Sequence, residues 1–438
     1  MTIPSEPAGL SFVPRDVLRV MEKIHGEGFD VWIVGGALRD RLLGLAAKDW
    51  DLATGAGPEW IMRLFPRVIP VGLKHGTVQV HTRSRDIEVT SYAPPGEAGI
   101  LKDLSRRDFT MNALALSYPE GLLIDPFGGR DDLKKRLLRA VGDPAARFSE
   151  DPLRILRAGR LSAAYGFAVD PGTFRAMHRL SETLEKVSAE RIRDEVCKIL
   201  LARYPVDAFD LLGKSGAIRQ ILPELAARDR VDALPGSGLD IYRHSLLCVV
   251  HCPERLRVRL AALLQNCAVP VRETGGGGES PFDYRRESAL AASARMKKWN
   301  MSNRQIEEVS CLVENRLPPD AEGWSDSRIR QFIARVGTEL LDDFVALAAS
   351  QRTVEGEAGW QELERFHGRL REQVGVISAM RIQDLAVGGG DIMRALGLSQ
   401  GPEVGRVLRK LFERVLEDPA LNTREHLMEI VRRDFTAG

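Results

Sequence analysis

The stretch Val31-Trp32-Ile33-Val34-Gly35-Gly36-Ala37-Leu38-Arg39-Asp40, followed closely by Asp49-Trp50-Asp51-Leu52-Ala53-Thr54, decides how the first part of this chain folds. Its first four residues predict a buried strand that ends at two glycines. Residues 37–43 then predict a short helix, and residues 49–54 predict the next strand. A strand, a tight glycine turn and a helix N-terminus expose backbone N–H groups that can bind an anion, and Arg39 adds a positive charge beside them.

Two acidic residues of the second strand are expected on one face. Because side chains alternate along a strand, Asp49 and Asp51 project together, while Trp50 and Leu52 point to the other side. Two neighbouring carboxylates repel each other unless a cation lies between them. Their hard oxygen atoms favour Mg²⁺, which commonly binds substrate phosphates as well. Together with the glycine turn, the two carboxylates fit a site for nucleotidyl transfer assisted by two Mg²⁺ ions about 4 Å apart. The alternative is that the glycines form an ordinary structural turn without a catalytic role.

A third carboxylate is usual at a site of this kind. Glu88 is the candidate, because it is a lone acid between the apolar residues Ile87 and Val89 of a predicted strand. The alternative is that Glu88 belongs to an edge strand and faces solvent.

The second motif, residues 103–113, places two arginines beside an acid and an asparagine. Arg107 is suited to phosphate, because a guanidinium donates two parallel hydrogen bonds. Asp108 and Asn112 are four residues apart and could share one ligand, such as a ribose. Structural ion pairs between the arginines and the acids are the alternative.

The third motif, residues 148–160, opens a helix in which Pro152 suits the first turn. Asp151, Arg154 and Arg157 step by three along one face. A carboxylate accepts and a guanidinium donates in a plane, so such a pair can hydrogen-bond the edge of a base. The alternative is a Glu150–Arg154 ion pair of little energetic consequence.

Composition limits the class of protein. The 438 residues exceed what one hydrophobic core holds, so two to four domains are expected, and 44% hydrophobic with 28% charged residues is typical of a soluble globular protein. The sequence shows neither a membrane span nor a secretion signal, and its five cysteines lack metal-binding spacing, which predicts reduced thiols in a cytoplasmic protein. The net charge of +1 argues against a uniformly basic nucleic-acid binder, although basic residues outnumber acidic ones between Arg130 and Arg160.

The pattern of the chain changes near residue 145. Before it, short strands mix with helices, and Thr77–His81 with Asp86–Thr90 predicts a hairpin. Residues 108–116 predict a further helix or strand. After it, helical periodicity dominates, and residues 273–281 predict a flexible loop. The predicted fold class is α+β, with a long all-α extension. Helical patterns occur at 151–166, 188–203, 205–213, 242–265, 284–316 and 327–350.

Taken in order, these motifs resemble the class II tRNA nucleotidyltransferase and bacterial poly(A) polymerase family. The resemblance implies a polymerase-β-like nucleotidyltransferase head followed by a helical neck, body and tail that clamp the acceptor arm of tRNA. The implied domains are a catalytic head (1–145), a nucleotide-selecting neck (146–215), a degenerate phosphohydrolase-like body (216–325) and a tRNA-binding tail (326–438). The matching pieces are residues 35–54, 106–113, 125–129, 150–154, 190–195 and 385–427.

The resemblance also implies roles for individual residues. Asp49 and Asp51 would be the metal ligands, with Glu88 as the third catalytic carboxylate. CTP or ATP would be the nucleotide, and the 3′ end of tRNA would be the acceptor. The sequence does not set the oligomeric state. The nucleotide-binding residues would be Gly35, Gly36 and Arg39 at the triphosphate, Arg107, Asp108 and Asn112 at phosphate and ribose, and Asp151, Arg154, Arg157 and Arg160 along the base-selecting helix.

The chain departs from the family pattern in two places. Residues 93–102 are shorter than the flexible loop that CCA-adding members carry, which favours CC addition; full CCA addition and A addition remain alternatives. Gln265 and Asn266 stand where a phosphohydrolase would have a His-Asp pair, so we expect no such activity, and His244 is expected to be a structural residue. A poly(A) polymerase and a non-catalytic RNA-binding scaffold are the more distant alternatives.

Overall fold

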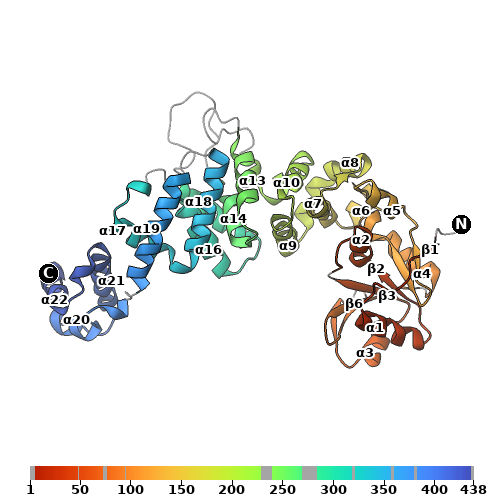
Figure 1. Ribbon diagram of the computed structural model, residues 1–438, viewed down its shortest axis with the longest axis horizontal. Coiled ribbons are helices and arrows are strands. Elements are labelled where there is room, and N and C mark those ends of the chain that lie inside the picture. The colour runs from red at the N-terminus through yellow and green to blue at the C-terminus, as the bar shows by residue number, and fades with distance from the viewer. Residues whose placement is uncertain are drawn as a thin grey trace. The chain divides into compact units, whose positions relative to one another are not determined.

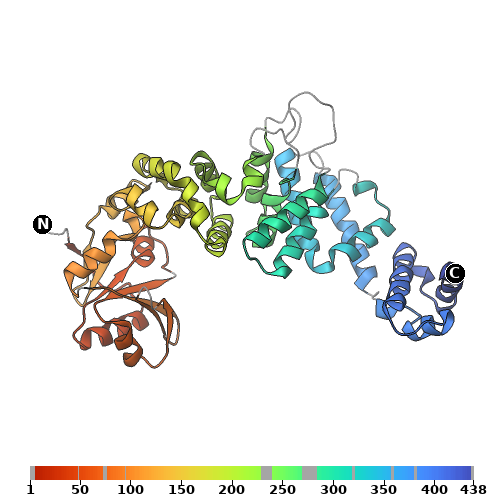
Figure 2. The same cartoon turned by 180° about the vertical axis from the view of Figure 1, so that it is seen from behind.

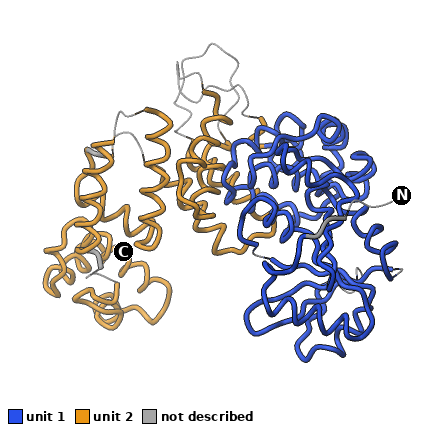
Figure 3. The backbone as a smooth tube through the Cα atoms, turned by 45° about the vertical axis from the view of Figure 1, so that its right-hand side comes forward, with its two compact units in different colours: residues 1–223 blue, residues 224–438 orange. Residues whose placement is uncertain are grey.

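The computed structural model describes residues 5–47, 49–72, 76–93, 95–227, 239–268, 284–317, 321–356, 360–378 and 382–435. The chain forms two compact units, residues 1–223 and 224–438, shown in separate colours in Figure 3. The predicted head and neck both lie in unit 1, and most of the predicted body and all of the tail lie in unit 2. The predicted loop at 273–281 lies outside the described residues, as does Lys48.

Unit 1 is built on one mixed sheet with the strand order β1-β8-β7-β2-β3-β6-β5-β4. β3 and β6 run parallel, and every other neighbouring pair is antiparallel. The predicted strands at 31–34 and 49–54 and the predicted hairpin are confirmed. The strands are β1 (Ser5–Pro7), β2 (Val31–Val34), β3 (Trp50–Thr54), β4 (Val68–Gly72), β5 (Thr77–His81), β6 (Asp86–Ser91), β7 (Ala115–Tyr118) and β8 (Leu122–Ile124).

Helices cover both faces of this sheet, with α1 and α3 on one side and α2 on the other (Figure 1). α4 packs on the face that carries Asp51, because its Ile100 and Leu104 share a buried cluster with Val34 and Ala53. Side-chain alternation along β3 puts Ala53 and Asp51 on the same face. The helices of this region are α1 (Arg15–Gly26), α2 (Gly36–Leu42), α3 (Pro58–Leu64), α4 (Glu97–Ser105), α5 (Gly129–Lys134) and α6 (Pro144–Glu150).

Two short predictions in the head need correction. Residues 93–102 are not a simple loop, since α4 begins at Glu97; Pro94 lies outside the described residues. Residues 108–116, predicted as one helix or strand, form a 3-10 turn, η2 (Thr110–Asn112), followed by the start of β7. The second difference arises because a short apolar run does not distinguish helix from strand. The helix α4 was not expected because it is short and contains a glycine.

Beyond α6 the described elements are helical, apart from the short strand β10 (Ala168–Val169), which pairs with β9 (Leu137–Leu138) from the segment before α6. Figure 2 shows this succession of helices from behind. The helices are α7 (Leu153–Tyr165), α8 (Pro171–Leu180), α9 (Ala189–Leu200), α10 (Pro205–Lys214), α11 (Ala217–Ile221), α12 (Pro223–Ala226), α13 (Ile241–His251), α14 (Leu256–Leu264), α15 (Arg285–Lys298), α16 (Asn303–Glu314), α17 (Asp326–Val336), α18 (Leu341–Glu355), α19 (Trp360–Ser378), α20 (Gly389–Leu396), α21 (Pro402–Glu417) and α22 (Arg424–Phe435).

The three longest predicted helical patterns each contain two helices. The chain leaves the helix near Pro253, at Asn300 with a φ of 52° and at Gly337 with a φ of 86°. Proline lacks the donor that a helix needs, and a positive φ ends a right-handed helix. In the part of the chain that the structure describes, no helix has the length and apolar character that crossing a bilayer requires.

Candidate active site

The glycine turn meets the acidic strand at the end of β2. Val34 pairs with Asp51 across β2 and β3, and Gly35 follows with a φ of 75°. A Cβ atom on Gly35 would lie 3.1 Å from Asp51 Oδ2 and 3.1 Å from Arg107 Nη1. Glycine is therefore required here both by its backbone conformation and by the close approach of the two side chains. The first and second sequence motifs converge at this point.

The carboxylates of Asp51 and Glu88 lie on one face of the sheet, and Asp49 is near enough to influence Asp51. Asp51 and Glu88 are register partners in the parallel pair β3–β6, so their side chains project to one face. Burial, reinforced by the negative charges of Glu88 and Asp49, raises the pKa of Asp51 to about 6, while Arg107 and Arg39 oppose this shift. Glu88 is exposed on β6 and contributes to the raised pKa of Asp51, and its catalytic role stays a prediction.

The donor set fits a divalent metal that is completed by substrate. Among the described residues, no three acidic, histidine or cysteine side chains form a closed metal-binding group. Mg²⁺ needs no such group, because it is usually held by one or two carboxylates together with phosphate oxygens and water. The carboxylates of Asp49 and Asp51 would supply those oxygens.

A hydrogen-bonded chain links the glycine turn to the neck helix α7. Arg39 Nη1 donates to Asn112 Oδ1 at 2.8 Å, and Asn112 Nδ2 donates to Asp108 Oδ1 at 3.0 Å. Arg157 closes the chain by donating to Asp108 Oδ2 from Nε at 2.8 Å and from Nη2 at 2.5 Å. Residues predicted from three separate motifs therefore form one connected group in unit 1.

The predicted base-selecting residues make protein contacts; Asp151 lies at the end of α6, and the three arginines lie on α7. Arg191 donates to Asp151 from both terminal nitrogens, at 3.2 and 2.8 Å. Arg154 Nη1 donates to Glu150 at 3.0 Å, which is the ion pair considered as the structural alternative, and Arg160 donates to Glu195 at 2.7 Å. Recognition of a base by these residues stays a prediction.

The sequence motifs did not single out several residues that hold this site together. Asp40 accepts hydrogen bonds from Arg39 Nε at 2.9 Å and from the Tyr165 hydroxyl at 2.8 Å. Asp103 accepts from Arg107, four residues later. The i,i+4 spacing of Asp103 and Arg107 was a readable signal, whereas the approach of Tyr165 to Asp40 across the chain was not.

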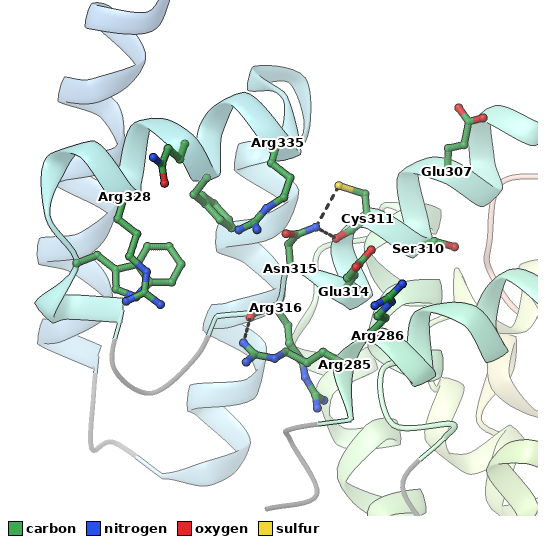
Figure 4. A pocket seen from close by; sticks show the side chains of 13 residues that line it. Arg285, Arg286, Glu307, Ser310, Cys311, Glu314, Asn315, Arg316, Arg328 and Arg335 are labelled. Atoms are coloured by element: carbon green, nitrogen blue, oxygen red, sulfur yellow. Dashed lines mark hydrogen bonds between the residues drawn. The ribbon is translucent and has the colours of Figure 1, made fainter. Parts of the chain in front are cut away.

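Unit 2 contains a basic cavity of about 890 Å³ (Figure 4), here called the arginine cavity. It is lined by arginines from α15, from the end of α16 and from α17, and Figure 4 shows these side chains surrounding one space. Arg328 lies over the Trp324 ring, 4.4 Å from its centroid. Glu307 and Glu314 also line the cavity. The arginines are Arg285, Arg286, Arg316, Arg328 and Arg335.

The positions that resembled a phosphohydrolase site lie in a buried polar cluster of unit 2. Gln351 Nε2 donates to Gln265 Oε1 at 2.5 Å, and Arg316 Nη1 donates to Asn266 Oδ1 at 2.5 Å. His244 is fully buried and lies 3.8 Å from a carboxylate oxygen of Glu355. These contacts give the two amides a structural role. The absence of phosphohydrolase activity stays a prediction.

Three family models match the chain. The poly(A) polymerase head domain matches residues 31–139, and a probable RNA- and SrmB-binding site of polymerase A matches residues 166–228. A putative tRNA nucleotidyltransferase domain 2 matches residues 286–431. The three matches follow one another in the order predicted for head, neck and the later helical region.

Similar proteins match along nearly their whole length. A CCA-adding enzyme of Geobacillus sp. is 31% identical over 97% of this chain and 98% of its own, and one of Streptococcus sanguinis is 32% identical over 95% and 94%. The crystal structure of the Bacillus stearothermophilus CCA-adding enzyme with CTP has a TM-score of 0.73 and 27% identity, and covers 96% of this chain and 97% of that one. The Thermotoga maritima CCA-adding enzyme in complex with tRNA, at 20% identity and a TM-score of 0.60, shares the fold.

Proposed function

This chain belongs to the tRNA nucleotidyltransferase and poly(A) polymerase family, and we propose that it adds nucleotides from CTP and ATP to the 3′ end of tRNA without a nucleic-acid template. The observation that carries this proposal is the meeting of Gly35, Asp51, Glu88 and Arg107 at one point of the sheet. That arrangement offers carboxylates for a metal and a guanidinium for a triphosphate within one small region.

The reaction assigned to this site is attack of the tRNA 3′ hydroxyl on the α-phosphate, with pyrophosphate as leaving group. Two Mg²⁺ ions held at Asp49 and Asp51 would lower the pKa of the attacking hydroxyl and stabilise the charge on the leaving group. Gly35, Gly36 and Arg39 bind the triphosphate, and Arg107 neutralises its charge. Glu88 helps to orient the metal-binding carboxylates.

Asn112 and Asp108 position the ribose and phosphate in this proposal, since they lie between Arg39 and α7. Asp151, just before α7, and Arg154, with Arg157 and Arg160 on α7, present donors and acceptors to the base edge. Asp151 and Arg154 must then exchange their bonds to Arg191 and Glu150 for bonds to the base. An incorrect base leaves a polar group unpaired, which costs about 1–3 kcal/mol and supplies selectivity.

Two observations favour different products. The short segment at residues 93–102, most of which is taken up by α4, favours arrest after CC. The relatives that match along almost the whole chain are named CCA-adding enzymes, which favours addition of all three nucleotides. We propose CC addition as the first hypothesis from this segment, with full CCA addition as the second.

The arginine cavity supports a tRNA-binding role for unit 2. Five arginines and two glutamates line it, so its field favours an anion, and phosphate groups are the anions that tRNA presents. We propose that a backbone phosphate of tRNA binds there. The division into head, neck, body and tail at residues 145, 215 and 325 is part of the same proposal.

One gel experiment tests the function. The protein, Mg²⁺, CTP and ATP are mixed with tRNA transcripts that end before CCA, after C or after CC. Growth by two nucleotides followed by arrest supports CC addition, and growth by three supports CCA addition. Extension of only the CC-ending transcript, by one nucleotide, identifies an A-adding enzyme. Long tails identify a poly(A) polymerase, and no extension supports the non-catalytic scaffold.

A further inference from the structure

Asp30, in the connection between α1 and β2, joins three parts of unit 1. Its Oδ2 accepts a hydrogen bond from the Tyr92 hydroxyl, one from Trp32 Nε1 at 3.1 Å and one from the backbone N–H of Gly96 at 3.3 Å. Trp32 Nε1 also lies 2.9 Å from the Tyr92 hydroxyl oxygen. We call this group of Asp30, Trp32, Tyr92 and Gly96 the Asp30 anchor. It fixes both ends of the short connection that follows β6.

The anchor is closely packed and electrostatically consistent. A Cβ atom on Gly55 would lie 2.8 Å from Asp30 Oδ1 and 2.8 Å from Pro95 Cβ, so the connection is pressed against the end of β3. Burial, together with the neighbouring Asp30 carboxylate, raises the pKa of Tyr92. The hydroxyl therefore stays protonated and donates a hydrogen bond to the Asp30 carboxylate.

The anchor determines where α4 starts. Gly96 has a φ of 85° and directly precedes α4. From there Ile100 and Leu104 insert into the cluster that contains Val34 and Ala53. The helix is thus held at its N-terminus by the anchor and along its inner side by the core. Any shift of the anchor moves a helix that lies on the face of the sheet carrying Asp51.

The other end of α4 holds an arginine of the candidate active site. Asp103 Oδ2 accepts hydrogen bonds from Arg107 Nε at 3.1 Å and Nη2 at 3.0 Å. The remaining nitrogen, Nη1, donates to the Asn112 carbonyl at 3.4 Å and is the atom that approaches Gly35. Because Asp103 engages two of its three nitrogens, the direction of the third is set by the position of α4.

We propose that Asp30 is a positioning residue for nucleotidyl transfer, because it fixes the start of α4 and α4 in turn directs Arg107 toward Gly35 and Asp51 through Asp103. This inference rests on the proposed function. Asp30 itself touches neither the carboxylates nor the triphosphate site in any contact described above. Its loss should therefore act on nucleotide binding and reaction through Arg107, and leave the binding of tRNA to unit 2 intact.

The test measures single-turnover addition to tRNA across a range of CTP concentrations, together with the Kd for tRNA. Asp30→Asn and Tyr92→Phe are each expected to raise the KM for CTP by about tenfold and to lower the maximal rate. The Kd for tRNA should change less than about twofold. A variant that is only partly folded would lose rate without a change in KM, so an unchanged KM in both variants overturns the proposal.

The chain offers a matched control. Asp16 on α1 also accepts several hydrogen bonds, from Thr82, Ser84 and Arg85, and ties the turn between β5 and β6 to that helix. Among the described residues, these hydrogen-bond partners of Asp16 all lie in the turn between β5 and β6 and not on α4. Asp16→Asn should leave the KM for CTP unchanged, and an equal rise in this control overturns the specific role of Asp30. Tyr92→Phe removes only one hydroxyl group from the anchor. It therefore still tests the proposal if the Asp30→Asn variant does not fold.

A double variant shows whether Asp30 acts through Arg107. Arg107→Ala alone should raise the KM for CTP, and adding Asp30→Asn should raise it little further. Independent, multiplying effects of the two changes would contradict the proposed route. If the unmodified protein adds no nucleotide to any tRNA, the proposed function is wrong. If it adds nucleotides and both Asp30→Asn and Tyr92→Phe have its KM for CTP, only this inference is wrong.

Discussion

Arg157 on α7 donates two hydrogen bonds to Asp108 Oδ2, and this pair joins the end of the catalytic sheet to the neck helix. Burial opposes ionisation of Asp108, but Arg157 and the Asn112 amide hold its pKa below the usual value. A carboxylate whose pKa is lower in the folded protein stabilises the fold above its unfolded pKa near 3.8. This stabilisation is lost as the pH falls through the lowered pKa that Asp108 has in the folded protein.

Arg157→Met should leave the buried Asp108 carboxylate without its cation. The Arg157 side chain is 35% exposed and Asp108 only 6%, so we expect a loss of about 2–4 kcal/mol at pH 7, somewhat less than for a fully buried pair. Urea unfolding measures this loss, which should shrink toward pH 3 as Asp108 becomes protonated. Arg193→Met, at the more exposed Arg193–Asp194 pair, is the control and should cost less than about 1 kcal/mol. Equal losses in the two variants would contradict the assignment.

Asp51→Asn should abolish nucleotide addition while stabilising the metal-free protein at high pH. The pKa of Asp51 is raised to about 6, so the folded protein favours the protonated carboxyl. As the pH rises from about 4 to above 6, the ionised carboxylate therefore lowers the free energy of unfolding. The metal-free variant should therefore melt at a higher temperature than the unmodified protein at pH 8, but not at pH 4. Mg²⁺ should raise the melting temperature of the unmodified protein only. An equal response of both proteins to Mg²⁺ would remove Asp51 from the metal site.

The local parts of this site could be predicted from sequence, and the long-range parts could not. The glycine turn and the acidic strand are adjacent in the chain, so the apolar run at residues 31–34 and the alternation at residues 49–54 were enough to predict them. The Arg157–Asp108 pair spans 49 residues, and no periodic pattern reports which helix reaches which turn. The Asp30 anchor escaped notice because a single acid between Phe29 and Val31 carries no spacing signal. The helix α4 was missed because residues 97–105 are short and contain a glycine.

Glu88 can be tested against a neighbour on its own strand. Asp86 and Glu88 lie two residues apart on β6, both exposed, so they share one face. Glu88→Gln should reduce the single-turnover rate by about 100-fold and lower the pH at which activity rises, since Glu88 contributes to the raised pKa of Asp51. Asp86→Asn, which instead removes the partner of His81, should leave both quantities unchanged. If the two variants behave alike, Glu88 is an ordinary strand residue and the catalytic pair is Asp49 with Asp51.

The arginine cavity predicts a salt-dependent effect on tRNA binding that is separate from chemistry. Arg286 and Arg335 line it from α15 and α17, and both are exposed, so reversing their charge should not disturb a core. Arg286→Glu and Arg335→Glu should each raise the Kd for tRNA by about tenfold. Each should also reduce the slope of log Kd against log salt concentration by about one. The KM for CTP should not change, because CTP is bound in unit 1. Arg304→Glu on α16 introduces the same charge change outside the cavity and should alter the salt slope less. A uniform response of all three variants would mean that unit 2 attracts tRNA by its overall charge, whereas a response confined to the cavity would identify a bound phosphate.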